Sequence, residues 1–181
     1  DTTYYFVTAG NVPGKRISLR PSSVLTPTDN VTKFDDYAYH ETDEYNLLKS
    51  GSRWYGDRMD NINNTKSFPI SFLNLLPSDS IYVSGNFIGR SITNGSNYFR
   101  ISIDGTLLTT LNFGIVGTSS TDTYANSVDF SAGKTGPIGS INVQFYSSDA
   151  GGQGWINFFD VNARCGLNIA GRSQFHFRDA K

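Results

Sequence analysis

The sequence has little of what usually marks a disulfide scaffold, a nucleic-acid binder or a membrane span. It contains one cysteine, so no internal disulfide can form and no covalent framework holds the fold. The net charge is only −1, from 15 Lys and Arg against 16 Asp and Glu, which gives no electrostatic attraction for nucleic acid. No apolar run approaches about 18 residues, so we expect no transmembrane segment.

Turn-forming and aromatic residues are abundant instead. Ser, Thr and Asn supply 53 of the 181 residues, there are 18 Gly, and aromatic residues make up 14% of the chain. This composition is typical of an ordered, strand-rich fold, because disordered chains have few aromatic residues and a large charge imbalance. The length suits one domain, and we expect residues 1–181 to form it.

Apolar and polar residues alternate along much of the chain with a period of two, which predicts an all-β fold. The expected strands are residues 4–8, 31–40, 66–73, 80–87, 99–103, 106–111, 124–130, 140–145 and 154–167. Asp104 and Gly105 predict a hairpin turn, because both accept a positive φ. Pro69 indicates an edge strand or a strand start, and Trp155 is expected in the core. Strands at this spacing favour an antiparallel β-sandwich or jelly roll.

Clean alternation stops between residues 41 and 64, where residues 45–49 suggest one helical turn and the remainder a loop. An irregular segment of about 24 residues is long, and such loops tend to be functional or packed against another element. Trp54 and Tyr55 lie in it, next to charged residues that favour an exposed rim. Aromatic side chains there stack on sugar rings or anchor an interface; alternatively, Trp54 fills one end of the sandwich.

No group of residues identifies a catalytic or metal centre. Cys165 lies in a strand-like stretch, where a cysteine is usually a small buried side chain, so we do not pair it with His40 or His176 as a nucleophile. The acidic patch at residues 40–44 and the oxygen-rich residues 57–63 lack the spacing of an EF-hand or a zincin helix, so we interpret them as solvated loops. We therefore expect no catalytic residue, no metal ligand and no cofactor in this chain.

Two motifs in the irregular segment resemble a known family. The chain reads Glu41-x-Asp43-x-x-Asn46 and then Ser50-Gly-Ser-Arg-Trp-Tyr-Gly-Asp57. This order resembles the region ahead of the peptidase domain in PorU-type sortases of the bacterial type IX secretion system, which are gingipain-like cysteine peptidases. Residues 7–17, 161–167 and 175–179 are similar to flanking segments of that family. The sequence departs from the family pattern at Ser52, which is inserted between Gly51 and Arg53.

The resemblance implies a non-catalytic domain that precedes a peptidase domain beginning after residue 181. Members of the family are exported, outer-membrane-associated enzymes of Bacteroidetes that remove C-terminal secretion signals from cargo proteins. None of their catalytic motifs lies in this chain, so no catalytic residue carries over. The ends of the sequence also suggest a piece of a longer polypeptide, with any signal peptide outside it. The resemblance implies that this polypeptide is exported to the surface of a Gram-negative bacterium. The implied partners are the downstream peptidase domain, secretion-system components and cargo proteins.

The candidate interaction residues are Glu41, Asp43, Asn46, Trp54, Tyr55 and Asp57. In an accessory domain, this segment is expected to dock on the neighbouring domain or to help position the substrate. The alternative is an independent carbohydrate-binding module of a secreted or cell-surface bacterial protein, in which Trp54 and Tyr55 contact a sugar. A free-standing hydrolase is the weakest interpretation, because no nucleophile–base pair has a recognisable spacing.

Overall fold

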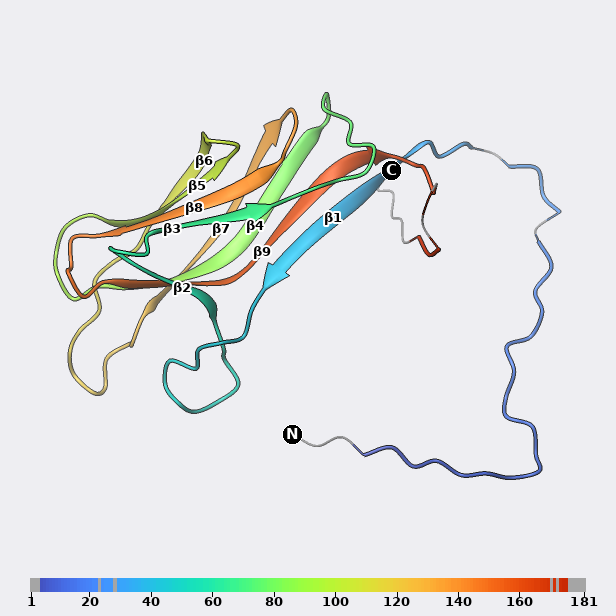
Figure 1. The fold of residues 1–181 in the computed structure, drawn as a ribbon, viewed down its shortest axis with the longest axis horizontal. Helices are drawn as coiled ribbons and strands as arrows, with labels where there is room; N and C mark the ends of the chain where they lie inside the picture. The colour runs from blue at the N-terminus through green and yellow to red at the C-terminus, as the bar shows by residue number, and fades with distance from the viewer. Residues whose placement is uncertain (1–3, 23, 28, 170, 172, 176–181) are drawn as a thin grey trace. The chain divides into compact units, whose positions relative to one another are not determined.

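The computed structural model describes residues 4–22, 24–27, 29–169, 171 and 173–175 (Figure 1). The chain divides into two units, Asp1–Asn30 and Val31–Lys181. The described residues of the first unit contain no strand, so the strand expected at residues 4–8 is wrong. Its apolar side chains are 78–97% exposed from Tyr4 to Val7. Alternation alone does not make a strand, because the backbone also needs a hydrogen-bonded neighbour.

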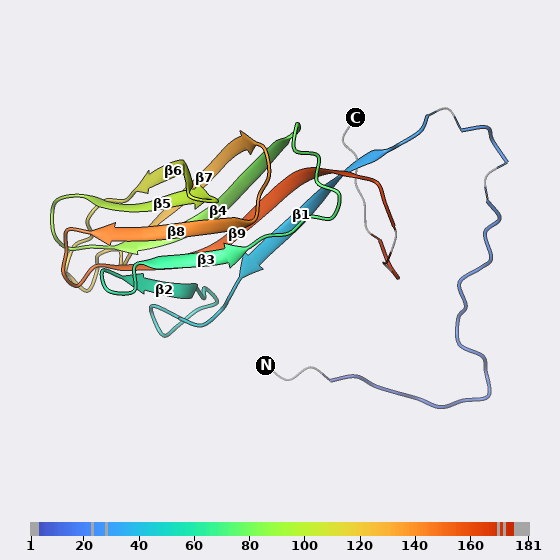
Figure 2. The ribbon, with the colours of Figure 1, turned by 45° about the horizontal axis from the view of Figure 1, so that its top comes forward.

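The second unit is a sandwich of two antiparallel sheets, which Figures 1 and 2 show as two layers. Its strands, among the described residues, are β1 (Lys33–Glu41), β2 (Gly56–Asp60), β3 (Thr65–Pro69), β4 (Ser80–Arg90), β5 (Asn97–Ile103), β6 (Thr106–Asn112), β7 (Asn126–Thr135), β8 (Ser140–Ser147) and β9 (Gln153–Gly166). The larger sheet has the order β1-β9-β4-β7, with β2 also paired to β9; the smaller has the order β3-β8-β5-β6. The expected all-β sandwich is confirmed. A single domain over residues 1–181 stays a prediction.

The core lies between the two sheets. The fully buried side chains on β4 and β5 are Ile81, Val83, Phe87, Phe99, Ile101 and Ile103. All six lie at odd-numbered positions of their strands, so one face of each strand turns inward and the other outward, as the sequence predicts. Cys165 is also fully buried. The inter-sheet core therefore uses the alternating positions and leaves most outward positions for polar and aromatic side chains.

A bulge in β9 changes which positions face outward. Asn86 pairs with Phe158 and Phe87 pairs with Ile156, so Asn157 is the extra residue. Beyond the bulge, Ile156 joins the inter-sheet cluster, whereas the neighbouring Trp155 does not, although it is buried. Trp155 is therefore buried as expected, but outside the core between the sheets.

The segment at residues 41–64 is more regular than the sequence suggests. It contains β2, which pairs with β9. The helical turn expected at residues 45–49 is wrong, because these residues form a turn in which the Lys49 amide donates to the Asn46 carbonyl at 3.2 Å. Pro69 ends β3 at the edge of the smaller sheet, as expected. No helix among the described residues is long and apolar enough to cross a membrane.

The predicted hairpin turn is confirmed and is fastened to a neighbouring loop. Asp104 and Gly105 have φ angles of 48° and 80°. The Asp104 carboxylate accepts hydrogen bonds from the Gly139 amide at 3.0 Å and from the Ser140 amide at 2.8 Å. The Ser140 hydroxyl donates to it at 3.1 Å. One side chain thus joins the β5–β6 turn to the start of β8.

Replacing Asp104 by alanine is expected to lower the free energy of unfolding by about 1–2 kcal/mol, since these hydrogen bonds are lost and alanine tolerates a positive φ poorly. Urea denaturation of the 181-residue chain measures the change. Asp104→Asn is the matched control, because asparagine keeps an acceptor oxygen and accepts this φ, and it should lose less. Equal stability of the alanine variant and the wild type would show that the hydrogen bonds to the Asp104 carboxylate contribute nothing to the free energy of unfolding.

Candidate functional site

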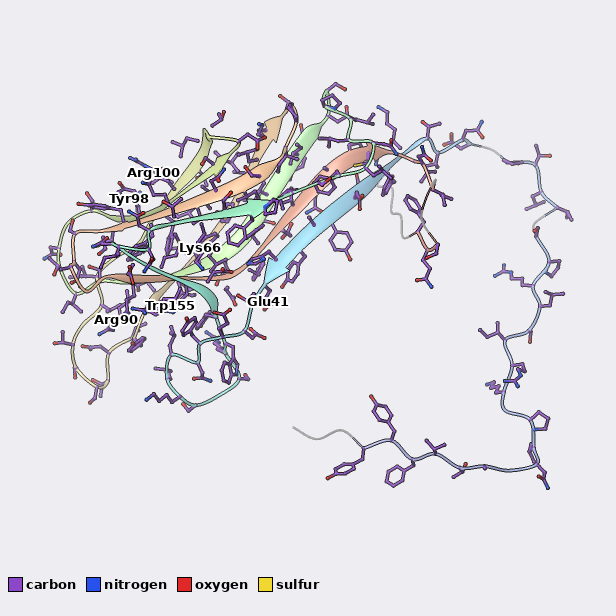
Figure 3. The ribbon with its side chains drawn as sticks, viewed as in Figure 1. Glu41, Lys66, Arg90, Tyr98, Arg100 and Trp155 are labelled. Atoms are coloured by element: carbon purple, nitrogen blue, oxygen red, sulfur yellow. The ribbon has the colours of Figure 1, made fainter. Side chains whose placement is uncertain are left out.

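A pocket of about 410 Å³ lies between the loop after β1 and the outer face of the larger sheet. We call it the loop pocket. One side of it is lined by Glu41, the last residue of β1, and by the loop residues Asp43, Ser52, Arg53, Trp54 and Tyr55. The sheet lines it with Asn86, Ser127, Asp129, Asn157 and Phe158. Figure 3 shows Glu41 at the end of β1, where this loop begins.

The strand register brings the sheet residues of the loop pocket into one row. Glu41 on β1 pairs with Phe158 on β9, Phe158 pairs with Asn86 on β4, and Asn86 pairs with Asp129 on β7. Neighbouring strands are about 4.8 Å apart, so these four side chains cross the whole sheet at one level. The row combines two carboxylates, an amide and an aromatic ring.

Hydrogen bonds hold the polar floor of the loop pocket in place. Asn86 is 8% exposed, and its Nδ2 donates to Ser127 Oγ and to Asp129 Oδ1, each at 2.7 Å. Its Oδ1 accepts from Asn157 Nδ2 at 3.1 Å. The Asn157 amide reaches Asn86 because the β9 bulge places it beside the row. The network fixes the Asp129 carboxylate, which presents further acceptor sites to the pocket.

The Glu41 carboxylate is held by a neighbouring phenol. Tyr39 Oη donates to Glu41 Oε2 at 2.5 Å. This hydrogen bond, with smaller contributions from burial and from nearby carboxylates, raises the pKa of Tyr39 to about 12. The phenol therefore keeps its proton at neutral pH and remains a hydrogen-bond donor.

The loop that carries Trp54 is closed by its own backbone. The Tyr45 and Tyr55 amides donate to each other's carbonyls at 2.8 and 2.9 Å. Within the closed loop, Asn46 Oδ1 accepts from the Ser50 amide at 3.0 Å. Trp54 is 44% exposed, so the ring is neither an end plug of the sandwich nor fully solvated. It lies at the edge of the loop pocket with one part open to a partner.

A second pocket, of about 390 Å³, lies on the other side of the same loop. We call it the apolar pocket, because its lining includes Leu47, Leu48, Tyr55 and Ile88. Asn46 lines it as well. Ile88 pairs in register with Trp155 on the outer face of the larger sheet, and both are buried. Trp155 Nε1 is buried without a hydrogen-bond partner among the described residues.

Asp57 has a different role from the other predicted residues and does not line the loop pocket. Its carboxylate binds His40 Nε2 at 2.5 Å and Lys66 Nζ at 3.1 Å. Burial raises the pKa of Asp57. The hydrogen bonds from His40 and Lys66 and the lysine charge together lower the pKa by more than burial raises it, so the net shift is downward. The three side chains come from β1, β2 and β3, so this cluster joins strands of both sheets.

Five of the six predicted interaction residues thus line one or both pockets, and these are Glu41, Asp43, Asn46, Trp54 and Tyr55. Their role in binding stays a prediction. Sequence reasoning missed the sheet side of the loop pocket, Asn86, Asp129, Asn157 and Phe158, because only strand order and register place them beside the loop. In the described part of the chain, no three His, Cys, Asp or Glu side chains gather to hold a metal ion. His176 lies outside the described residues.

No protein-family model and no curated protein matches this sequence. Solved structures do match the fold. Dimeric latent PorU from Porphyromonas gingivalis superimposes with a TM-score of 0.59 and 19% identity, over 78% of this chain and 14% of that chain.

Two carbohydrate-binding modules match at lower TM-scores. A family 35 carbohydrate-binding module from Clostridium thermocellum gives a TM-score of 0.38 at 15% identity, over 71% of this chain and 90% of that chain. The C-terminal CBM6 of LamC, a laminarinase from Zobellia galactanivorans, gives 0.39 at 18% identity, over 71% and 96%. The chain is therefore a β-sandwich, and its fold resembles one region of PorU that makes up about a seventh of the length of that chain.

Proposed function

We propose that this chain is a non-catalytic accessory domain of a bacterial type IX secretion-system sortase, in which it supports domain packing or substrate positioning. The observation that carries the proposal is the structural likeness to one region of PorU over 78% of the chain. The motifs at residues 41–57 resemble the same family. The parent protein is then an exported gingipain-like cysteine peptidase of the bacterial cell surface, which removes C-terminal secretion signals from cargo.

The loop beside the apolar pocket has the chemistry of a surface that packs against protein. Leu48 is 67% exposed and Trp54 is 44% exposed, although both adjoin pockets. Large apolar side chains at a pocket edge gain most when a partner removes them from water. Tryptophan is also among the residues that contribute most to protein interfaces. This surface is where we place the contact with the neighbouring domain or with cargo.

The test is a double substitution, Leu48→Ser with Trp54→Ala, in the full-length protein. We expect cargo processing to fall by about tenfold or more, since losing two interface anchors costs more than 1.4 kcal/mol. The thermal midpoint of the isolated 181-residue chain should change little, because both side chains are exposed there. Tyr146→Ala is the control, since Tyr146 has a similar exposure, 43%, on the smaller sheet. Normal processing by the double variant would count against the docking role.

A second candidate function, carbohydrate binding, is favoured by the lining of the loop pocket. Aromatic rings from Trp54 and Phe158 lie beside the carboxylates of Glu41 and Asp129 and the amide of Asn86. Rings pack on the apolar faces of sugars, while carboxylates and amides bind hydroxyl groups. Trp fluorescence reports such binding at Trp54, since Trp155 is buried. An unchanged Trp fluorescence with every polysaccharide and with lipopolysaccharide, at millimolar sugar, would rule out carbohydrate binding at this pocket.

A further inference from the structure

The outer face of the larger sheet continues from the loop pocket as a regular grid of side chains. The register gives three rows across β1, β9, β4 and β7: Glu41, Phe158, Asn86 and Asp129; then Tyr39, Asp160, Ser84 and Ser131; then Tyr37, Asn162, Tyr82 and Gly133. On β4 these positions alternate with Ile81 and Val83, which are buried in the core, so the grid faces away from it. We call the second and third rows, together with Phe158, the tyrosine face.

The exposed apolar groups of the tyrosine face are aromatic. Tyr37, Tyr39 and Tyr82 are 59%, 55% and 58% exposed. The three rows contain no Leu, Ile, Val or Met, in contrast to the apolar pocket with Leu47 and Leu48. A surface that binds sugar combines rings, which pack on the apolar faces of the sugar, with groups that hydrogen-bond to its hydroxyls. The tyrosine face has this composition.

Two of the rings lie against neighbouring parts of the sheet. A Cβ atom added at Gly133 would lie 3.2 Å from Cδ1 and 3.3 Å from Cε1 of Tyr82. The Tyr82 ring therefore lies over the β7 backbone at Gly133, where the absence of a side chain gives it room. The Tyr39 ring stacks on Phe158 with centroids 6.1 Å apart and planes inclined by 26°. Rings held in this way present an aromatic surface to a ligand at a small cost in side-chain entropy.

A carboxylate at the centre of the tyrosine face is already oriented for binding. Asp160 Oδ2 accepts from Ser84 Oγ at 2.8 Å, and Asp160 Oδ1 accepts from Asn162 Nδ2 at 2.6 Å. Each carboxylate oxygen has two acceptor sites, so each can also accept a hydroxyl from a ligand. This second network lies next to the network of Asn86 and Asp129 in the loop pocket. Rings and fixed acceptors therefore alternate along the face.

The charge of the grid selects the class of ligand. Its ionisable carboxylates are Glu41, Asp129 and Asp160, and its three rows contain no Lys or Arg. An acidic ligand would be repelled there, whereas uncharged hydroxyl groups find acceptors. In the loop pocket the single positive charge of Arg53 is outnumbered by the carboxylates of Glu41, Asp43 and Asp129. Tyr82 and Asn86 are four residues apart on β4, about 13 Å, so the grid is longer than one sugar ring.

We propose that the tyrosine face binds an uncharged glycan chain that continues into the loop pocket. This inference rests on the second candidate function and assigns the main sugar contacts to Tyr37, Tyr82 and Asp160 on the sheet, whereas Trp54 on the loop makes an end contact. An oligosaccharide binds more tightly than its monosaccharide, because only a chain reaches from the third row to the pocket.

The experiment is affinity electrophoresis of the 181-residue chain in gels that contain laminarin, xylan, mannan or polygalacturonate. We expect retardation by at least one of the three neutral polysaccharides and none by polygalacturonate. Tyr82→Ala and Tyr37→Ala should each weaken binding by about tenfold, and Tyr82→Phe should keep most of it, because the ring carries the contact. Tyr146→Ala, on the opposite sheet, is the matched control and should bind as the wild type does. Circular dichroism of each variant checks that it folds.

The outcomes separate the inference from the function on which it rests. If the wild type binds none of the four polysaccharides, the carbohydrate function fails and the tyrosine face fails with it. If the wild type binds one, and binding survives Tyr82→Ala and Tyr37→Ala but is lost with Trp54→Ala, the function stands and our placement of the sugar is wrong. Retardation by polygalacturonate alone would overturn the proposal of an uncharged ligand.

Discussion

The Phe99→Ala variant is expected to lose about 3–5 kcal/mol of unfolding free energy, the largest effect we predict for a single substitution. Phe99 is fully buried on β5, in the middle of the smaller sheet. Its ring centroid lies 5.2 Å from that of Phe87 on the facing sheet, 5.3 Å from that of Phe145 and 5.5 Å from that of Phe113. Removing the ring takes contacts from both sheets at once.

The space left by the Phe99 ring cannot close easily. A Cβ atom added at Gly154 on β9 would come within 2.7 Å of the rings of Phe99 and Phe145, which shows how closely the two sheets approach at this point. The sheet backbones keep that separation, so the alanine variant should retain a cavity, and cavities add to the lost transfer energy.

Urea denaturation followed by circular dichroism measures the loss in the Phe99→Ala variant. Ile103→Val at another fully buried position of the same strand is the control and should lose only about 0.5–1.5 kcal/mol. A loss below about 1 kcal/mol for Phe99→Ala would mean that the ring is not the centre of the core.

Removing the Asp57 carboxylate is expected to have the second largest effect, about 2–3 kcal/mol. The Asp57→Ala change leaves His40 and Lys66 without their shared acceptor in a half-buried place. Solvent still reaches these side chains, so the loss should be smaller than for a fully buried ion pair. Asp57 also has a φ of 47°, which alanine adopts less readily. Asp57→Asn keeps an acceptor oxygen and accepts this φ, so it should lie between the wild type and the alanine variant.

The same carboxylate makes stability depend on pH in acid. The pKa of Asp57 in the folded protein lies below its ordinary value of 3.8, because the hydrogen bonds from His40 and Lys66 outweigh the effect of burial. A lowered folded pKa means that the ionised form stabilises the fold above the unfolded value and that this contribution is lost as pH falls through the folded value. The difference in unfolding free energy between the wild type and Asp57→Ala should therefore shrink from about pH 6 to pH 2. Urea titrations at several pH values measure it, and a constant difference would contradict the assignment.

The sequence predicts the sandwich well where each strand has a strong pattern of its own. The alternation in residues 99–111, with Asp104 and Gly105 between the apolar runs, predicts β5, β6 and their turn. It fails at β2, because Gly56–Asp60 contains a single large apolar side chain, Met59, and the strand is defined only by its pairing with β9. At residues 4–8 the alternation predicts a strand that does not form, because no strand lies beside this segment among the described residues.

The candidate site is less predictable, because it depends on contacts between distant strands. The motif residues Glu41, Trp54 and Tyr55 are visible in the sequence, and their loop is recognisable by its lack of alternation. Their neighbours Asn86 and Asp129 lie on polar positions of ordinary strands, and nothing local distinguishes them from other outward-facing residues. Asp57 shows the converse limit, because a motif residue in the same loop binds His40 and Lys66 and does not line the loop pocket.

The extra residue in β9 has a consequence for any insertion or deletion in this strand. Because Asn157 takes no place in the ladder, the outward positions are even-numbered after it and odd-numbered before it. Deleting Asn157 would therefore remove the bulge and leave the rest of β9 in phase, with Trp155 still facing outward and Ile156 still facing the core. Only the Asn157 amide that donates to Asn86 Oδ1 would be lost. A residue inserted between Trp155 and Ile156 would instead exchange the faces of Trp155 and of the residues before it, and would turn the indole toward the space between the two sheets.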